Sequence, residues 1–476
     1  MNKSIRIRGI DDITGNSWAI LKWVQETLSD LFATHAYRFI ETPMLEPTDL
    51  FVRKGGGGIT TQMYSFSTPD GLQVSMRPEF TSSIVRHCIE AESLPRLPIR
   101  LQYSGPVFRF DVDTGDNHQF HQSGIELIGS DHPRSDSEVL ALGCLGISTL
   151  GLEKTQLVMT DLDIFSQILN HYGLSDRGRL FVMNHISILQ KGGDALLHVK
   201  EKARTLGLLR PNQQPKINID DVSSMSETKA RHLIAEMLKR DEIGSLGRRT
   251  PNQITERLLR KMWGNHDSSN MDPALEIAGA LAIIKGDPQY CLKAAKDILK
   301  AHRLTSISLE KLEETLNLLN SESISDTSLI LDFGLARGMS YYTGIVFELT
   351  DATGKTSFGS GGRYDGLANS LGSEKKLPAL GFAYNLEHLI SFFGENPKSP
   401  GSSEDTTQST LVLPMNSESY RKALEIAKDL RANGNNVEID VFMRNLEESI
   451  AYALSNSIDV IVTVGECGVE NEYNVG

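Results

Sequence analysis

The chain has 476 residues, of which 39% are hydrophobic and 23% charged, and its formal net charge is −13. This composition is typical of a folded protein with about two to four domains. No apolar run reaches the roughly 18 residues of a membrane helix, and the N-terminus lacks a signal core, so we expect a cytoplasmic protein without a membrane partner. The four separated cysteines predict neither a disulfide framework nor a zinc site.

The first 174 residues carry helix and strand signals that favour an antiparallel sheet. Residues 17–37 place apolar side chains at helical spacing, and the apolar stretch 38–45 follows them. Three further segments alternate apolar and polar residues between Gly, Pro and Asp turns, which predicts strands at 72–80, 99–111 and 119–129. The pattern indicates a sheet with helices beside it and not a series of βαβ units.

Residues 175–322 have a different character and predict a helical insertion. Four stretches in it have a helical period: 226–240, 254–263, 273–284 and 309–320. Strand character returns in a second part of the core, 323–393. Residues 394–410 are rich in Pro, Gly, Ser and Thr and predict a flexible linker. Beyond it, 411–476 alternate strand and helix patterns, which predicts a small α/β domain that ends short of its last expected elements.

The stretch "GDNHQFHQSGIELIG", residues 115–129, holds two histidines on a predicted strand. His118 and His121 are three positions apart and so point to opposite faces, which disfavours a metal site. Gln122 and Glu126 are four apart and share a face. They can therefore point together into one pocket, with Gly124 leaving room between them.

Glu79 and Arg109 are charged residues in segments that otherwise predict apolar strands. They form either a structural ion pair or part of a cleft, where the planar fork of an arginine suits a carboxylate or a phosphate. A later region contributes Arg337, the pair Tyr341–Tyr342 and Tyr364. Its glycines at 359, 361 and 362 either let a ligand approach the backbone or form a bulge.

Taken together, these segments resemble the histidyl-tRNA synthetases, a family of class II aminoacyl-tRNA synthetases. "YRFIETPMLEPTDLF" resembles the family's motif 1, and "RPEFTSSIVR" through "GPVFRFD" and "QFHQSGIELIG" resembles its motif 2. "GFAYNLEHL" occupies the place of motif 3. "LARGMSYYTGIVFE" and "GSGGRYDGL" resemble the two signatures that are specific to the histidine enzymes. The resemblance implies an α+β fold with a class II-type antiparallel sheet, flanking helices, a helical insertion and a C-terminal α/β anticodon-binding domain.

The resemblance also implies a function. The protein would charge tRNA with histidine through histidyl-adenylate, using ATP accompanied by Mg²⁺ and no tightly bound cofactor. It would form a homodimer through motif 1, around Pro43. Basic residues of the insertion either contact the tRNA acceptor arm through its phosphates or form a solvated helix face: Lys239, Arg240, Arg248, Arg249, Arg257, Arg260 and Lys261.

Residue roles follow from the resemblance. Glu79, Thr81 and Gln122 would hold the α-amino group of histidine. Glu126 and Tyr342 would hydrogen-bond the two imidazole nitrogens, and Tyr364 would help to close the pocket. Arg109 and Arg337 would be the catalytic cations, which grip the amino acid carboxylate and the α-phosphate of ATP, with Asp111 beside the nucleotide. An imidazole has one donor and one acceptor and so needs different partners on its two sides.

Three positions depart from the family pattern. Asp116 and His388 stand where the family has arginines that meet the triphosphate, and Asp111 replaces a glutamate. An aspartate repels a phosphate, and a largely neutral histidine replaces a full charge. This leaves a second hypothesis open, the regulatory paralogue of ATP phosphoribosyltransferase. That protein senses histidine for a catalytic partner subunit and does not charge tRNA.

Overall fold

In the computed structural model, the described residues are 7–91, 97–110, 118–209, 267–322, 326–335, 341–393 and 408–475. The chain forms two compact units, Met1–Asn396 and Pro397–Gly476, and each is described by itself. The predicted domain boundaries at 174, 322 and 393 and the predicted linker remain predictions.

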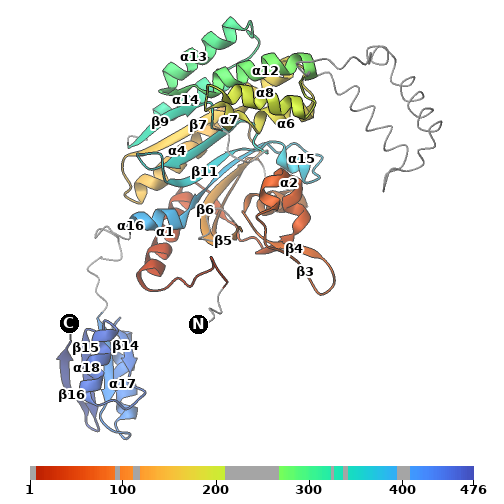
Figure 1. The fold of residues 1–476 in the computed structure, drawn as a ribbon. Helices are drawn as coiled ribbons and strands as arrows, with labels where there is room; N and C mark the ends of the chain where they lie inside the picture. The colour runs from red at the N-terminus through yellow and green to blue at the C-terminus, as the bar shows by residue number, and fades with distance from the viewer. Residues whose placement is uncertain are drawn as a thin grey trace. The chain divides into compact units, whose positions relative to one another are not determined.

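The larger unit is built on a nine-stranded sheet that runs through its centre (Figure 1). The strands in spatial order are β1 (Arg38–Phe39), β5 (Ile99–Phe108), β6 (Gln119–Ile128), β12 (Ala379–Asn385), β11 (Ser357–Arg363), β10 (Ile345–Thr350), β7 (Thr155–Asp161), β9 (Thr327–Asp332) and β8 (Lys285–Gly286). Neighbours are antiparallel except for the pairs β1–β5 and β7–β9. The predicted antiparallel sheet is confirmed.

Helices cover one face of this sheet and bury its main core. They are α1 (Gly15–Thr34), α4 (Pro133–Thr149), α14 (Glu310–Ser321) and α16 (Leu386–Phe393). Helix α1 was predicted from the spacing of its apolar residues, and Leu21, Val24 and Leu28 are all buried on one side of it. On the sheet, Ile125 and Leu127 of β6 point into the same core, so the odd-numbered side chains of this strand face the helices.

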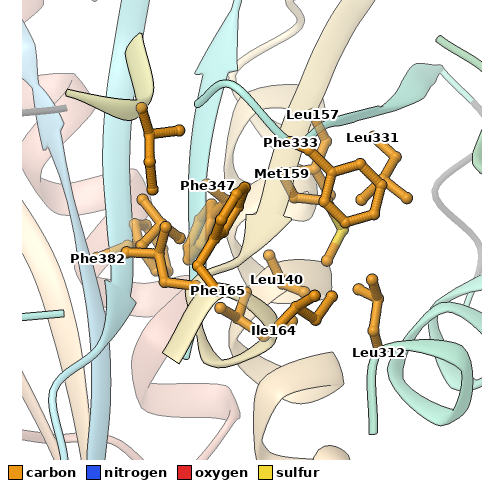
Figure 2. Packing of buried hydrophobic residues seen from close by; sticks show 14 of the residues in the cluster. Leu140, Leu157, Met159, Ile164, Phe165, Leu312, Leu331, Phe333, Phe347 and Phe382 are labelled. Atoms are coloured by element: carbon orange, nitrogen blue, oxygen red, sulfur yellow. The ribbon is translucent and has the colours of Figure 1, made fainter. Parts of the chain in front are cut away.

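Aromatic rings fill the centre of this core. Phe347 of β10 and Phe382 of β12 meet edge to face with ring centroids 6.1 Å apart. Figure 2 shows them beside Phe165 of α5 (Leu162–His171), while Leu312 of α14 approaches from the far side of the cluster. Each large apolar side chain buried in this way stabilises the fold by about 2 kcal/mol. The packed core fixes the strands that carry the opposite face.

The opposite face of the sheet is covered by shorter elements. They are α2 (Thr48–Thr60), α3 (Thr81–Glu90) and α15 (Leu367–Ser370), with a small sheet of β2 (Leu45–Pro47), β4 (Gln73–Met76) and β3 (Ser65–Ser67). The strand prediction at 72–80 was too long, because β4 ends at Met76 and the following residues turn into α3. The apolar stretch 38–45 contributes the two-residue β1 and, after a loop, Leu45 at the start of β2.

Further helices lie together beyond the β7–β9–β8 edge of the sheet (Figure 1). They are α6 (Asp176–Met183), α7 (Ile186–Leu189), α8 (Ala195–Thr205), α12 (Asp267–Ala282) and α13 (Pro288–Ala301). The predicted helices at 273–284 and 309–320 correspond to α12 and α14. Those at 226–240 and 254–263, with all the basic residues singled out between 239 and 261, lie outside the described residues.

The smaller unit is a four-stranded sheet with helices on both faces. Its strands in order are β14 (Asn436–Ile439), β13 (Ser409–Pro414), β15 (Val460–Gly465) and β16 (Gly468–Asn474), and its helices are α17 (Tyr420–Ala432) and α18 (Leu446–Ser455). The predicted α/β alternation is confirmed. Strand β16 was not predicted, because its polar, largely exposed residues show no apolar alternation.

Asp161, at the end of β7, carries a buried carboxyl that accepts a hydrogen bond from the Asp163 amide at 2.9 Å. Burial raises its pKa from 3.8 to about 7. A carboxyl whose pKa is higher in the folded state stabilises the fold below its unfolded pKa, and this contribution is lost as the pH rises through 7. We therefore expect Asp161→Asn, which keeps the accepting oxygen, to raise the free energy of unfolding at pH 8 by up to about 4 kcal/mol.

The measurement is chemical denaturation at pH 5.5 and pH 8. At pH 5.5 the gain in the free energy of unfolding should be about half as large. The buried Asp161 carboxyl is then largely protonated in the folded state, so the protein avoids part of the cost of burying a charge. Asp163→Asn, two residues away, is the matched comparison and should show a much smaller gain at pH 8, because burial is the largest cause of the raised Asp161 pKa and the charge of Asp163 is a lesser one. A gain for Asp161→Asn that is independent of pH would contradict the assignment of the buried charge.

Candidate functional site

A cavity of about 490 Å³, including its opening to solvent, lies on the sheet face opposite α1 and α4. Residues from six separate segments line it: Glu79, Thr81, Tyr103, Arg109, Gln122, Glu126, Tyr341, Tyr342, Ser360, Tyr364, Gly381, Phe382 and Ala383. All seven candidate residues that fall in the described ranges are therefore brought together. The other two candidates, Asp111 and Arg337, lie outside those ranges.

Strand β6 supplies the floor of the cavity. Gln122 and Glu126 both line it, as expected for residues four apart on one strand. Gly124 lies between them, where a Cβ atom would sit 2.2 Å from the Phe382 carbonyl oxygen and 2.7 Å from the Tyr103 hydroxyl. Glycine is thus required at this position for β12 and Tyr103 to approach so closely.

Glu126 is the most heavily contacted polar group of the cavity. Its side chain is 1% exposed, and its Oε1 accepts a hydrogen bond from the Thr81 hydroxyl at 2.7 Å. Its Oε2 accepts one from the Tyr364 hydroxyl. A buried carboxylate needs such partners because leaving it unpaired is costly. The resemblance gave Tyr364 the role of closing the pocket, and the structure adds a direct bond from it to Glu126.

Gly381 faces Glu126 directly across the β6–β12 ladder. A Cβ atom at position 381 would lie 1.7 Å from Glu126 Oε2 and 2.5 Å from the Ile125 carbonyl oxygen. No heavy atom tolerates such a separation without movement. The absence of a side chain at 381 therefore makes the space that the Glu126 carboxylate occupies.

Glu79 and Arg109 lie outside the strands in which they were predicted. Glu79 sits in the turn before α3, where both its carboxylate oxygens accept from the Ser82 amide at 3.2 Å. Arg109 follows the last residue of β5, and its Nε donates to the Pro78 carbonyl at 2.8 Å. Burial lowers the pKa of Arg109, and the negative charge of Glu79 opposes that shift. The turn before α3 and the end of β5 thus place the Glu79 carboxylate and the Arg109 guanidinium at one wall of the cavity.

Phenol groups form the remaining wall. The ring of Tyr342 packs on Gly362, where a Cβ atom would lie 2.8 Å from it, and its centroid lies 4.5 Å from that of Tyr341, with the two rings tilted to each other by 42°. Burial raises the pKa of Tyr342 to about 12 and that of Tyr364 well above 10. Both hydroxyls therefore keep their protons at neutral pH. That of Tyr364 donates to Glu126, and that of Tyr342 carries a proton that a ligand could accept. Sequence reasoning assigned no role to Tyr341, Tyr103 or Ser360, and no periodic signal marks Tyr103 as different from other strand residues.

The two histidines of the stretch 115–129 have different neighbours. His118 Nδ1 lies 2.6 Å from the Tyr64 hydroxyl, whereas His121 Nδ1 lies 2.9 Å from the Glu387 carboxylate. That carboxylate also accepts from the His121 amide at 2.8 Å. In the described ranges, no group of three or more His, Cys, Asp or Glu side chains is arranged to hold a metal ion.

A family model described as Histidyl-tRNA synthetase matches residues 9–206 and 221–389, which is more than half of the chain. The chain belongs to the histidyl-tRNA synthetase family. A second model, described as Anticodon binding domain, matches residues 409–475, which cover the smaller unit. Both parts of the expected resemblance are confirmed.

Individual members of the histidyl-tRNA synthetase family match along nearly the whole chain. The histidine–tRNA ligase of Pyrococcus horikoshii is 28% identical over 471 residues, which cover 98% of this chain and 92% of that protein. The ligase of Methanocaldococcus jannaschii is also 28% identical, over 96% of this chain and 91% of that one.

Solved structures share the fold. The apo histidyl-tRNA synthetase of S. aureus is 21% identical, with a TM-score of 0.58 over 99% of this chain and 97% of that one. An ATP phosphoribosyltransferase regulatory subunit/histidyl-tRNA synthetase from Bacillus halodurans is 19% identical, with a TM-score of 0.66 over 98% of this chain and all of that one. These likenesses confirm the predicted fold class.

Of the two positions expected to replace arginines of the histidyl-tRNA synthetase pattern, only His388, in the first turn of α16, lies within the described residues. Its amide donates to the Asn385 side chain at 3.2 Å, and its ring Nδ1 lies 2.6 Å from the Ser357 carbonyl oxygen. Its side chain is exposed. Asp116, the other replacement, lies outside the described residues.

Among the described helices, none is long and apolar enough to cross a membrane.

Proposed function

We propose that this protein is a histidine–tRNA ligase that activates histidine with ATP and transfers it to tRNA. The observation that carries the proposal is the cavity that gathers Glu79, Gln122 and Glu126 with two protonated phenols around one space. Family membership gives this cavity its reaction class, and the relatives along the whole chain are histidine–tRNA ligases.

The cavity chemistry suits free histidine. The cationic α-amino group finds a carboxylate, a hydroxyl and an amide oxygen in Glu79, Thr81 and Gln122. The imidazole has one donor and one acceptor, and Glu126 accepts while Tyr342 donates. Tyr364 and Thr81 hold Glu126 in place by bonding its two oxygens. An amino acid whose side chain lacks this pair of groups would leave buried partners unsatisfied, and the site would reject it.

Activation requires the histidine carboxylate to attack the α-phosphorus of ATP, with pyrophosphate as the leaving group. Arg109 stands at the cavity wall with a guanidinium that suits the carboxylate and the α-phosphate. In the proposal Arg337 grips the same groups from the second side, and Asp111 adjoins the nucleotide. Mg²⁺ would accompany ATP and would supply positive charge beside its phosphates. Positioning and charge stabilisation are the main contributions of the protein.

Histidine-dependent exchange of pyrophosphate into ATP tests the proposal. Robust exchange, followed by histidine transfer to tRNA, would establish the ligase. A second candidate is the regulatory paralogue of ATP phosphoribosyltransferase, with its catalytic subunit as partner, and it is favoured by the histidine at position 388, where the family resemblance leads us to expect an arginine. Tight histidine binding without exchange would establish that candidate instead.

Position 388 provides a separate prediction. We expect His388→Arg to lower the KM for ATP about two- to five-fold, because an exposed cation facing a triphosphate gains a modest attraction. Pyrophosphate exchange at varied ATP concentrations measures it. His388→Gln, which adds no charge, is the control and should leave the KM for ATP unchanged. Equal KM values for both variants would mean that position 388 does not face the triphosphate.

The proposal extends to partners and location. The smaller unit, which matches the anticodon-binding model, would contact tRNA together with the helical insertion. A homodimer would form through motif 1, where Phe39, Met44 and Leu45 are about half exposed around Pro43, next to the edge strand β1. Exposed apolar clusters of this kind mark protein contact sites. The mass of the protein in solution tests this assembly, and cell fractionation tests the cytoplasmic location.

A further inference from the structure

We propose that the buried ion pair Arg363–Asp136, which lies behind the histidine cavity and outside it, positions Tyr342 and Tyr364 for histidine binding. Neither member of the pair lines the cavity. The inference rests on the proposed function, since histidine binding is its readout. It assigns a binding role to two residues that have no place in the site described above.

Every donor of the Arg363 guanidinium is used. Its Nε and Nη2 donate to Asp136 Oδ1 at 2.9 and 2.7 Å, and Nη2 also donates to the Ser135 hydroxyl at 3.1 Å. Its Nη1 donates to the Ser130 carbonyl at 2.8 Å and to Asp365 Oδ1 at 3.0 Å. Five bonds from a planar group fix both the position and the orientation of residue 363.

The fixed residue directly precedes Tyr364. The Tyr364 amide donates to the Ala379 carbonyl at 2.8 Å, and the Ala379 amide donates to Asp365 Oδ1 at 3.1 Å. The carboxylate of Asp365 thus bonds both Arg363 and β12. These bonds hold the backbone on each side of Tyr364. The position of the backbone in turn directs the phenol toward Glu126, to which it donates.

The segment that carries Tyr342 is tied to the same point. The Thr343 amide donates to the Arg363 carbonyl at 2.8 Å, and the Asp365 amide donates to the Thr343 hydroxyl at 3.0 Å. A Cβ atom at Gly344 would lie 3.0 Å from Arg363 Cδ, so the arginine stem also packs under this segment. Arg363 therefore sets the backbone next to both tyrosines.

The energetics favour a positioning role over a stabilising one. Both side chains of the pair are 7% exposed, so two charges have been removed from water. The cost of that removal nearly offsets the attraction between the charges, and well-packed apolar residues would stabilise the fold as well. What the ion pair adds is a single defined geometry. It joins the first turn of α4, on the core face of the sheet, to the two signature segments on the cavity face.

The decisive experiment is a double-mutant cycle read by calorimetric titration with histidine. We expect Asp136→Asn to weaken histidine binding about ten-fold and to leave the KM for ATP unchanged. Combined with Tyr364→Phe, it should cost clearly less than the sum of the two single effects, because both act through the same phenol. Thr343→Val, which removes only the linking hydroxyl, should weaken binding in the same direction.

Glu138→Gln is the matched control. It breaks the Arg100–Glu138 ion pair, which also joins α4 to the sheet but contacts neither tyrosine segment, and histidine affinity should not change. Wild-type histidine affinity in folded Asp136→Asn and Thr343→Val, or effects strictly additive with Tyr364→Phe, would overturn the inference. Failure of the wild-type protein to bind histidine would instead overturn the proposed function.

Discussion

Glu126→Ala should weaken histidine binding by more than about 100-fold and abolish the preference for histidine over other amino acids. The substitution removes the acceptor of two hydrogen bonds and leaves the hydroxyls of Thr81 and Tyr364 without a partner inside the cavity. The loss applies equally to a ligase and to a histidine sensor, since both depend on the same recognition.

Calorimetric titration with histidine, lysine and glutamine measures this effect. Glu126→Gln provides a graded control, because it keeps the shape of the side chain and one accepting oxygen, and its affinity for histidine should be intermediate. If Glu126→Ala discriminated among the three amino acids as the wild type does, Glu126 would have no part in recognition. The cavity would then need a different assignment.

Gly381→Ala should have an effect of similar size with the addition of a single methyl group. The new Cβ would overlap Glu126 Oε2 at 1.7 Å and crowd the Ile125 carbonyl at 2.5 Å. The carboxylate must then rotate away from Thr81 and Tyr364, or β12 must separate from β6. Either movement dismantles the recognition site, and we expect histidine affinity to fall by more than about 100-fold.

Gly366→Ala is the matched control for this substitution. Position 366 lies in the signature "GSGGRYDGL", but a Cβ atom there meets nothing within 4 Å, so histidine affinity and unfolding temperature should stay unchanged. Circular dichroism would show whether Gly381→Ala remains folded. Wild-type histidine affinity in a folded Gly381→Ala protein would mean that the Glu126 carboxylate can leave its observed position without consequence.

Strand β6 shows how far local sequence reasoning reaches into the site. Its period of two placed Gln122 and Glu126 on one face, and both line the cavity. The same reasoning assumed that Glu79 continued a strand, yet β4 ends at Met76 and Glu79 lies in a turn. Alternation cannot show where a strand stops, because turn residues can continue the apolar pattern by chance. Tyr103 was missed for a related reason, since an inward aromatic residue on a strand is ordinary.

The sequence by itself determined many of the elements, the α+β class, the family and seven of the residues around the cavity. These follow from local periodicity and from motifs read within short segments. Only the tertiary structure decided that Gly381 stands opposite Glu126, and that Arg363 reaches Asp136 on a distant helix. The period of a segment fixes the direction of a side chain relative to its own backbone. What that side chain meets depends on which strands become neighbours, and this is settled by packing across the whole core.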